Sequence, residues 1–512
     1  MISVVYCSPE PMSSHIDHIK KTVGIKDAEI IEYINKGEPL TKFYNKALKQ
    51  TKNKIVVFCH NDIIFNTKNW GKKLISHFND SRFGILGVAG TTEMQSTGRW
   101  WQNPSLMLGQ VKHTHEGKTW NSAYSPKFGD EILESILVDG LFFAVHKDRL
   151  KNSFDEDIKG FHFYEVDFCF KNHLGGTKVG VITNITITHK SIGQTNEEWE
   201  KNRRQFVENH SKNLPYSLKP PILVKDKKIT LKKNPTVGVV IPTKGNVSLL
   251  KECVSSLVTM DNYSNLKIYI GDTGSSLEEL EEIKNYIQDK PNIKLIEYNY
   301  YNFASINNDM VSNHVEEDVE LLLFCNNDIK LLNNAITQMV EVFNTNKQTG
   351  TVGIRLHFED NKIQHSGVVA FVDKDYNIRI SHHGIGSYFN YHQGRKEVFG
   401  NTAAFMMIKK TLFNQIGGFK ETYNECFEDV ELNIECLNKR LKNYLVGSAV
   451  AYHYESQTRN KDKEKLKREY EDYTQRLLPK IIGSRMCHNH FSNIDKNNLS
   501  LIIKNKYKTL TT

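Results

Sequence analysis

An Asn- and Asp-rich turn follows a fully apolar segment at two places in the chain. Asn326-Asn327-Asp328 follows 319–325, and Asn61-Asp62 follows 55–59. Such short apolar runs predict buried strands, and a carboxylate at the end of one costs little only if it is solvated, hydrogen-bonded or bound to a cation. Oxygen ligands suit Mg²⁺ or Mn²⁺, which commonly bridge carboxylates to substrate phosphates. An ordinary Asn/Asp turn would explain either segment alone, but its occurrence in both halves favours a cation site.

A second acidic cluster opens a segment with helical periodicity. Phe427-Glu428-Asp429 follows the breaker pair Gly417-Gly418, and apolar residues recur at positions 430, 434, 437 and 441. We therefore expect Glu428 and Asp429 at a helix N-terminus, where the helix dipole favours an ionised carboxylate. In a cleft, such a carboxylate can accept a proton from an attacking hydroxyl. Ordinary helix capping by Asp is the alternative.

A histidine follows each acidic cluster at the same distance. His453 lies 24 residues after Asp429 (453 − 429), and His189 lies 24 residues after Glu165 (189 − 165). A neutral imidazole can bind a metal or contact a phosphate. A lone histidine is more often structural, but the identical spacing favours a function for both.

The two halves of the chain share these features in one order and at nearly one offset. Asp62 and Asp328 are 266 residues apart (328 − 62), and the segments 163–168 and 427–432 are 264 apart (427 − 163). Solenoid repeats recur every 20–50 residues, so this pattern predicts two copies of one domain.

Breaker residues mark the predicted boundary between the copies. Leu214-Pro215 and Pro220-Pro221 are followed by a Lys-rich stretch that ends at Pro235. We predict a first domain over 1–215, a linker over 216–235, a second domain over 236–483 and a short C-terminal tail over 484–512.

Strand-like and helix-like segments alternate in the second copy. The strand-like segments are 237–241, 266–271, 293–298 and 319–325, and the helix-like segments between them are 246–259, 277–287 and 305–315. This alternation predicts an α/β fold with a mostly parallel, Rossmann-like sheet flanked by helices. Ligands of such sheets bind beyond the carboxyl ends of the strands.

Composition excludes several classes of protein. The 512 residues are 39% hydrophobic and 25% charged, which argues against general disorder. No run approaches the roughly 18 apolar residues of a membrane span, and the N-terminus has no signal-peptide pattern. The eight cysteines form no CxxC pair, so we expect free thiols in the cytoplasm. The net charge of +8 comes without a basic stripe interleaved with aromatics, so no nucleic-acid partner is expected. The basic stretch 459–468 is expected to be an exposed helix with paired charges.

Residues 236–460 resemble glycosyltransferase family 2, whose members have the GT-A fold. The resemblance rests on an ordered set of motifs: Val239–Thr243, Gly271–Ser276, Asn302–Asn308, Asn326–Asp328, Gly400–Ala404, Phe427–Glu431, and His453 followed by Tyr454–Ser456. Residues 1–200 resemble a more divergent branch through His60–Asp62, Gly140–Phe143, Tyr164–Asp167 and His189. Two tandem GT-A domains are therefore expected.

The resemblance implies roles for individual residues. In the second domain it implies Asp429 as the general base and Asp328 and His453 as metal ligands, with Asn326 where the family has its first metal-binding acid. Contacts to the nucleotide donor would come from Asp272, Pro242, Asn302, Asn307, Asn327 and Glu428. In the first domain it implies Asp62 and His189 as metal ligands, and either Glu165 or Asp167 as the catalytic carboxylate.

The implied activity is an inverting, metal-dependent glycosyl transfer. The donor would be a nucleotide-diphosphate sugar, with a UDP-sugar expected, and the cofactor would be Mn²⁺ or Mg²⁺. The product would be a surface polysaccharide or glycoprotein glycan built on a glycan, glycoprotein or lipid-linked acceptor, with two active sites at work. The sequence leaves open a peripheral contact with the inner face of a membrane and gives no indication of oligomeric state.

Two other functions stay open. In the first alternative, only the second domain is active, and the first domain is an acceptor-binding scaffold. In the second alternative, the chain is a non-catalytic nucleotide-sugar binding protein. Trp100 and Trp101, which have no counterpart in the second half, fit either a sugar-stacking face or the core.

Overall fold

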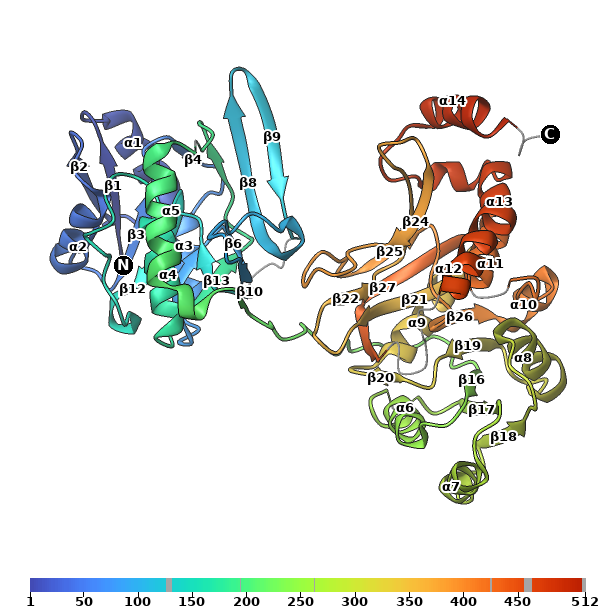
Figure 1. Cartoon of the computed structure of the whole chain (residues 1–512). Coiled ribbons are helices and arrows are strands. Elements are labelled where there is room, and N and C mark those ends of the chain that lie inside the picture. Colours follow the sequence, from blue (N-terminus) through green and yellow to red (C-terminus); the bar gives the residue numbers. More distant parts are fainter. Residues whose placement is uncertain (126–130, 194, 262, 424–425, 455–462, 509–512) are drawn as a thin grey trace. The chain divides into compact units, whose positions relative to one another are not determined.

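The computed structural model describes residues 1–125, 131–193, 195–261, 263–423, 426–454 and 463–508 (Figure 1). The chain divides into two compact units, Met1–Pro221 with Ser387–Asn390, and Ile222–Gly386 with Tyr391–Thr512. Each unit combines a large sheet with helices, so the expected α/β fold in two tandem domains is confirmed. The predicted boundaries of the domains, linker and tail stay predictions.

The first unit is built on a seven-stranded sheet with the strand order β10-β13-β5-β12-β3-β1-β2. Its strands are β1 (Ile2–Ser8), β2 (Glu29–Ile34), β3 (Ile55–Cys59), β5 (Phe83–Gly87), β10 (Ile132–Ser135), β12 (Phe142–His146) and β13 (Lys178–Ile182). Strand β1 pairs in parallel with β2 and β3, so these three strands end at one edge of the sheet. All five residues of β3 are buried, which explains its uninterrupted apolar sequence.

A second sheet in this unit brings Asp62 next to His189. Its strands are β4 (Ile63–Phe65), β6 (Ala89–Thr91), β8 (Met107–His115), β9 (Lys118–Ala123), β11 (Leu137–Val138) and β14 (Ile187–His189). Strands β4 and β14 are antiparallel, and their register pairs Ile63 with His189. Because Asp62 directly precedes Ile63, this register places the carboxylate beside the imidazole. Strands β8 and β9 form a long hairpin that is visible in Figure 1.

The second unit repeats this relation within a ten-stranded sheet. Its main path is β18-β17-β16-β19-β26-β21-β27-β20. These strands are β16 (Val237–Thr243), β17 (Leu266–Asp272), β18 (Ile293–Glu297), β19 (Leu321–Cys325), β20 (Ile329–Leu331), β21 (Thr349–His357), β26 (Phe405–Lys409) and β27 (Lys442–His453). Strand β20 is antiparallel to β27, and Ile329 pairs with His453. Asp328 therefore lies beside His453, just as Asp62 lies beside His189.

Helices surround the sheets of each unit, and two of them, α4 and α11, carry the acidic clusters. Those of the first unit are α1 (Ser13–Val23), α2 (Leu40–Gln50), α3 (Trp70–His77), α4 (Tyr164–Leu174) and α5 (Glu197–Asn209). Those of the second are α6 (Val247–Thr259), α7 (Leu277–Ile287), α8 (Phe303–Asp309), α9 (Ala335–Thr345), α10 (Lys410–Ile416), α11 (Glu428–Asn438), α12 (Lys463–Glu471), α13 (Leu478–Gly483) and α14 (Lys496–Lys506). Among the described residues, no helix has both the length and the apolar character needed to cross a membrane.

Two of the predicted segments are described only in part. Glu455 and Ser456 of the late histidine motif, and positions 459–462 of the basic stretch, lie outside the described residues. The rest of that stretch belongs to α12. Helix α14 lies in the predicted tail, and its Leu499 and Ile503 are buried in a hydrophobic cluster with residues of α11 and α13.

Helices α4 and α11 begin in the same unusual way. Phe163 and Phe427, the residues before them, have left-handed backbone conformations with φ of 66° and 83°. This conformation is rare for a bulky residue and costs about 1–2 kcal/mol. This backbone conformation turns the chain sharply just before each helix. The first turn of each helix then contains acidic residues, which the helix dipole favours.

A buried amide ties α11 to the loop 400–404. Asn433 Oδ1 accepts hydrogen bonds from Thr351 Oγ1 at 2.6 Å and from the Asn401 N–H at 3.1 Å. Its Nδ2 donates to Asn401 O at 2.8 Å and to Asp429 O at 2.6 Å. Asn433 is fully buried, so each of these bonds satisfies a group that water cannot reach.

Replacing Asn433 by Ala is expected to destabilise the second unit. The change leaves several buried polar groups unpaired, which costs about 2–3 kcal/mol and lowers the melting temperature by roughly 5–10 °C. Differential scanning calorimetry measures the shift, and Asn313→Ala, at an exposed position, is the control. Equal melting temperatures for the two variants would show that this network does not hold the helix.

Candidate active sites

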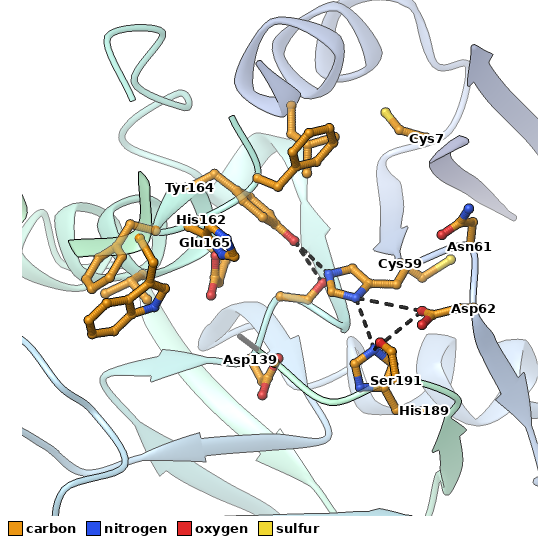
Figure 2. A pocket seen from close by; sticks show the side chains of 18 of the residues that line it. Cys7, Cys59, Asn61, Asp62, Asp139, His162, Tyr164, Glu165, His189 and Ser191 are labelled. Carbon is orange, nitrogen blue, oxygen red and sulfur yellow. Dashed lines mark hydrogen bonds and ion pairs between the residues drawn. The ribbon is translucent and has the colours of Figure 1, made fainter. Parts of the chain in front are cut away.

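The first unit has a cavity of about 560 Å³ at the ends of β1 and β3 (Figure 2). Asp62, His189 and Glu165 all line it, together with His60 and Asp139. The structure thus brings together three of the four residues predicted for this domain. These residues come from strand ends and from the first turn of α4, which are separate parts of the sequence.

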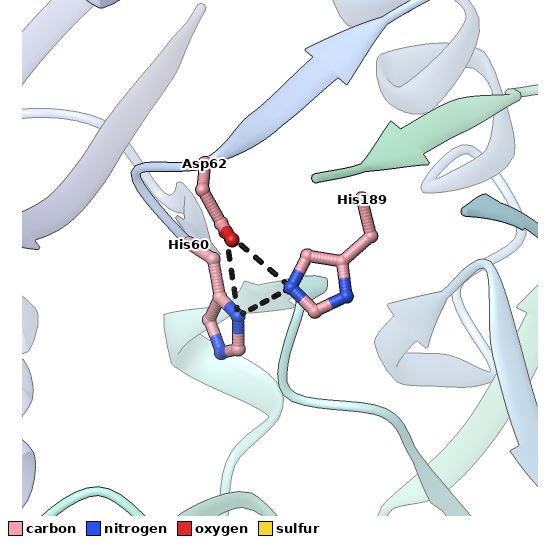
Figure 3. A group of neighbouring side chains, drawn as sticks. All are labelled: His60, Asp62 and His189. Atoms are coloured by element: carbon pink, nitrogen blue, oxygen red, sulfur yellow. Dashed lines mark hydrogen bonds and ion pairs between the residues drawn. The ribbon is translucent and has the colours of Figure 1, made fainter. Parts of the chain in front are cut away.

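His60, Asp62 and His189 form a tight group (Figure 3). His189 Nε2 lies 3.3 Å from Asp62 Oδ1 and 3.4 Å from His60 Nδ1, and the distance from His60 Nδ1 to Asp62 Oδ1 is 4.0 Å. His60 also contacts the Tyr164 hydroxyl through Nε2 at 3.3 Å. One carboxylate oxygen and two ring nitrogens therefore converge on one small volume.

The charges of this group are strongly coupled. Burial by itself would raise the pKa of Asp62, but the hydrogen bonds from His189 and Ser191, together with the charges of His189 and His60, outweigh burial and hold that pKa well below its usual range. Burial likewise favours the neutral form of His189, yet the Asp62 carboxylate outweighs it, and the pKa of His189 is raised. The Asp62 carboxylate therefore favours a proton on His189. A divalent cation could take the place of this proton, because a metal binds the deprotonated ligands.

Glu165 and Asp167 have different surroundings, although both lie in the first turn of α4. Glu165 faces the cavity, and burial together with the Asp139 carboxylate raises its pKa to about 8. Asp167 is fully buried away from the cavity; its Oδ1 lies 2.8 Å from His210 Nε2, and its Oδ2 lies 3.2 Å from Lys171 Nζ. Of the two carboxylates that the sequence left open, only Glu165 lines the cavity, and Asp167 is paired inside the protein.

Glycine at position 140 allows the loop after β11 to pack onto α4. A Cβ there would lie 2.5 Å from Tyr164 Oη and 3.0 Å from Glu165 Cδ. Any larger residue would push these side chains away. The backbone oxygen of Gly140 also accepts a hydrogen bond from the Tyr164 hydroxyl at 3.1 Å. The close approach of Gly140 therefore helps to position Tyr164 and Glu165 in the first turn of α4.

The second unit has a cavity of about 780 Å³ in the corresponding place. Seven of the nine residues predicted for this domain line it: Pro242, Asn302, Asn327, Asp328, Glu428, Asp429 and His453. Thr402, Ala403 and Ala404 of the Gly400–Ala404 motif also line it. The cavity thus collects residues from strand ends, from a helix N-terminus and from the loop that Asn433 anchors.

Asp328 and His453 meet at the centre of the second site. His453 Nε2 lies 3.2 Å from Asp328 Oδ1 and 3.1 Å from Asn326 Nδ2. On the other side of the ring, His453 Nδ1 lies 2.6 Å from Gln364 Oε1. Because this oxygen only accepts, Nδ1 carries a ring proton, and Nε2 is the ring nitrogen that faces Asp328. An acceptor behind the ring is the usual arrangement for a metal-binding histidine.

These donor sets fit a divalent cation. Within the described part of the chain, Asp328 Oδ1 is buried and accepts no hydrogen bond, although a buried carboxylate oxygen needs a partner. It lies 3.2 Å from His453 Nε2, and a cation bound by both side chains would give this oxygen a partner. The first unit offers two imidazoles, from His60 and His189, beside Asp62. The second unit offers one imidazole, from His453, beside Asp328 and Asn326. Imidazole ligands shift preference from Mg²⁺ toward transition-metal ions such as Mn²⁺.

Asp429 lines the same cavity as this pair. Its Oδ2 accepts a hydrogen bond from the Ala403 N–H at 2.9 Å, and its Oδ1 accepts one from the Val430 N–H at 2.7 Å. Glu428 precedes it and also lines the cavity. The next acid of the helix, Glu431, is buried and bonded to the Tyr423 hydroxyl and to Lys480. Asp429 and Glu431 thus divide their roles as Glu165 and Asp167 do.

Two predicted donor contacts lie outside the second cavity. Asp272 is buried, and its Oδ2 accepts hydrogen bonds from the backbone N–H groups of Gly274 and Ser275, both at 3.2 Å. Asn307 is also buried, and its Nδ2 donates to Phe303 O at 2.8 Å. Thr273, next to Asp272, does line the cavity. In this structure, Asp272 and Asn307 shape the loops around the cavity, and a direct contact with the donor stays a prediction.

Sequence reasoning did not assign a role to three residues of these sites. His60 belongs to a motif on which the family resemblance rests, but the resemblance assigned a role only to Asp62 of that motif. Asp139 precedes the Gly140 motif. No pattern in the sequence predicts that it lies near Glu165. Gln364 orients His453 from a different strand, β22 (Ile363–His365). Only the His60 signal, a histidine two residues before an aspartate in a strand-end turn, was available in the sequence.

Comparisons with known proteins place both halves among glycosyltransferases. Residues 9–210 match a family described as "Glycosyltransferase like family", and residues 238–417 match "Glycosyl transferase family 2". Over 232 residues, the chain is 25% identical to the O-antigen biosynthesis protein RfbC of Myxococcus xanthus, a match that covers 44% of this chain and 18% of that protein. Over 238 residues, it is 27% identical to the uncharacterized protein y4gI of Sinorhizobium fredii, a match that covers 44% of this chain and 25% of that one. The chain therefore matches a quarter or less of the length of these relatives.

A crystal structure of GalNAc-T7 with UDP, GalNAc and Mn²⁺ is among the similar solved structures. It is 14% identical, with a TM-score of 0.37, and the likeness covers 52% of this chain and 54% of that one. At this TM-score the likeness supports no conclusion about the present sites.

The raised pKa of Glu165 predicts a pH-dependent stability of the first unit. In the folded chain Glu165 keeps its proton up to about pH 8, and in the unfolded chain it loses the proton near pH 4.5. Rising pH therefore favours unfolding between these values, by up to about 1.4 kcal/mol per pH unit. Glu165→Gln removes this slope, so the variant gains stability relative to the wild type from pH 5 to pH 8.

Urea unfolding in EDTA, followed by tryptophan fluorescence, measures this effect. All five tryptophans lie in the first half of the chain, so the signal reports the first unit alone. Glu208→Gln, at an exposed position on α5, is the matched control. Parallel stability curves for wild type and Glu165→Gln would contradict the raised pKa.

Proposed function

We propose that this chain, which consists of two tandem domains of the glycosyltransferase family 2 type, transfers sugars from nucleotide-diphosphate sugars to a growing surface polysaccharide or glycoprotein glycan. One observation supports this proposal above all. Each unit has a cavity in which a strand-end carboxylate and an imidazole face a second carboxylate at a helix N-terminus. The retention of this set in both copies favours two working sites over a scaffold.

The strand-end groups are the proposed cation ligands. Asp328 and His453 would hold Mn²⁺ or Mg²⁺ in the second domain, and His60, Asp62 and His189 would hold Mn²⁺ in the first. When bound, the cation supplies Lewis-acid stabilisation of the negative charge on the departing diphosphate. Gln364 keeps His453 in the tautomer that this role needs. A UDP-sugar is the proposed donor.

The helix N-terminal carboxylates are the proposed general bases. Asp429 accepts the proton of the acceptor hydroxyl on its carboxylate as the hydroxyl attacks the anomeric carbon. The N–H groups of Ala403 and Val430 hold that carboxylate in place before the reaction. Glu165 has the same role in the first domain, but it must first lose a proton that its raised pKa retains at neutral pH. A single displacement inverts the anomeric carbon and needs no covalent nucleophile, unlike a retaining glycosidase.

The name of one relative supports the proposed class of product. The Myxococcus xanthus protein is named for O-antigen biosynthesis, which supports a surface polysaccharide built on a glycan or lipid-linked acceptor. Eight free cysteines support a reducing compartment, so we place the reaction in the cytoplasm, with peripheral contact to the inner face of the membrane as part of the proposal.

Asn substitutions of the strand-end aspartates are expected to silence one site each. Asp328→Asn removes the charge that holds the cation in the second domain, and Asp62→Asn does so in the first. Each change is expected to lower donor hydrolysis by that domain about a hundredfold, equivalent to about 3 kcal/mol. The assay uses Mn²⁺ with UDP-glucose, UDP-N-acetylglucosamine, GDP-mannose and dTDP-rhamnose.

Asp360→Asn is the matched control, because the Asp360 side chain is 49% exposed and pairs with Lys362. Full activity in both single variants and in the double variant would overturn the cation assignment. If Asp328→Asn alone abolishes all hydrolysis and Asp62→Asn has no effect, the first domain is a scaffold.

A further inference from the structure

A row of aromatic rings leads away from the candidate base of the first cavity. Phe163 directly precedes α4, and its ring centroid lies 5.2 Å from that of Trp199. The Trp199 ring lies 5.4 Å from Trp101, which lies 5.7 Å from Trp100. All four rings line the cavity. The mechanism proposed above uses none of them.

Trp199 is held in place by its helix. It lies in the first turn of α5, where its backbone N–H donates to the capping side chain of Asn196 at 2.8 Å. Its ring is 6% exposed and packs against Phe163, with the Arg99 guanidinium 5.7 Å from the ring centroid. Trp199 is therefore a fixed part of the cavity wall.

The loop that carries Trp101 is anchored to the same helix. The Arg203 guanidinium of α5 donates a hydrogen bond to the backbone oxygen of Thr97. Gly98 has a φ of +74°, and a Cβ there would lie 2.8 Å from Val207 Cγ2, so only glycine allows this close approach. The loop thus presents Trp101 in a defined orientation.

Trp101 differs from its neighbours in exposure. Trp100 is 8% exposed, whereas Trp101 is 38% exposed although it lines a cavity. Its ring makes a T-shaped contact with Trp100 at 84° and a tilted contact with Trp199 at 49°. Neither contact is a parallel stack that would cover a face of the Trp101 ring. A supported indole with open surface in a cavity is suited to a flat apolar partner.

The polar groups around this ring indicate what kind of partner fits. Glu165, His162 and Asn196 line the same cavity. Figure 2 shows Glu165 and His162 across the cavity from Asp62 and His189. A pyranose ring matches this environment, because one face is made of C–H groups and its rim carries hydroxyls. The opposite side, at Asp62 and His189, is where the proposed diphosphate would bind.

We propose that Trp101, supported by Trp199, is the stacking surface for the acceptor sugar of the first domain. The C–H face of a pyranose lies on the indole, and one rim hydroxyl is directed toward Glu165. This inference rests on the proposed function, since it names the acceptor class for that site. This stacking tryptophan is specific to the first domain, because the second half of the chain contains no tryptophan.

Ligand-detected NMR tests the subsite without the donor or the cation. Saturation-transfer difference spectra are recorded in EDTA on the full chain with methyl β-D-galactopyranoside, methyl β-D-glucopyranoside and methyl α-L-rhamnopyranoside. Galactitol, an open-chain polyol without a C–H face, is the ligand control. We expect at least one pyranoside to bind, with its saturation concentrated on ring protons, and galactitol to give no signal.

Variants assign this binding to Trp101. Trp101→Ala is expected to weaken the affinity about tenfold, which corresponds to about 1.4 kcal/mol, and Trp101→Phe to recover part of it. Trp120→Ala is the matched control, because Trp120 is 42% exposed and lies on the β9 hairpin outside the cavity lining.

Three results would overturn the inference. The first is no pyranoside binding to the wild type, and the second is equal pyranoside affinity for the wild type and Trp101→Ala. The third is full displacement of the pyranoside by UMP, which would show that the Trp101 ring stacks on the nucleobase. Pyranoside binding that depends on Trp101 supports the subsite even if no donor is hydrolysed. Donor hydrolysis without pyranoside binding refutes the subsite and leaves the proposed function standing.

Discussion

The contact between a strand-end aspartate and a histidine on an antiparallel neighbour organises each half of this protein. The atoms are 3.3 Å apart for Asp62 and His189 and 3.2 Å apart for Asp328 and His453. In both units the histidine pairs in register with the residue after the aspartate. A slip of one residue would turn the histidine to the other face of the sheet. Backbone pairing therefore fixes the proposed cation site before any ligand binds, and the preformed geometry lowers the ordering cost of binding.

The second constraint is the start of the helix that carries the candidate base. A phenylalanine in the left-handed region precedes the acids in both copies, and such strain persists only where the surrounding structure holds it. The two acids of each helix then have separate tasks. Glu165 and Asp429 face the cavities, whereas Asp167 and Glu431 are buried against cationic or hydroxyl partners. The buried acid of each pair fixes the orientation of the helix, and the other acid is left for chemistry.

The sequence predicted the alternation of strands and helices, the duplication, and seven of the residues that line the second cavity. These features depend on local periodicity and on turns at strand ends, which a single sequence records. The choice between Glu165 and Asp167 could not be predicted, because it depends on His210, which comes from a distant part of the chain. The position of Asp272 outside the cavity could not be predicted either, because its side chain accepts hydrogen bonds from backbone N–H groups of its own loop. The role of Gln364 depends on strand pairing. Contacts between distant segments leave no periodic signal.

The central claim is that each domain holds a divalent cation between its strand-end aspartate and histidine. Anomalous diffraction from crystals grown with Mn²⁺ and UDP tests it most directly. We predict one manganese peak in each domain, within bonding distance of Asp62 and His189 in the first and of Asp328 and His453 in the second, with the UDP phosphates on the same ion. Bound UDP in both cavities with manganese at neither pair of side chains would contradict the claim.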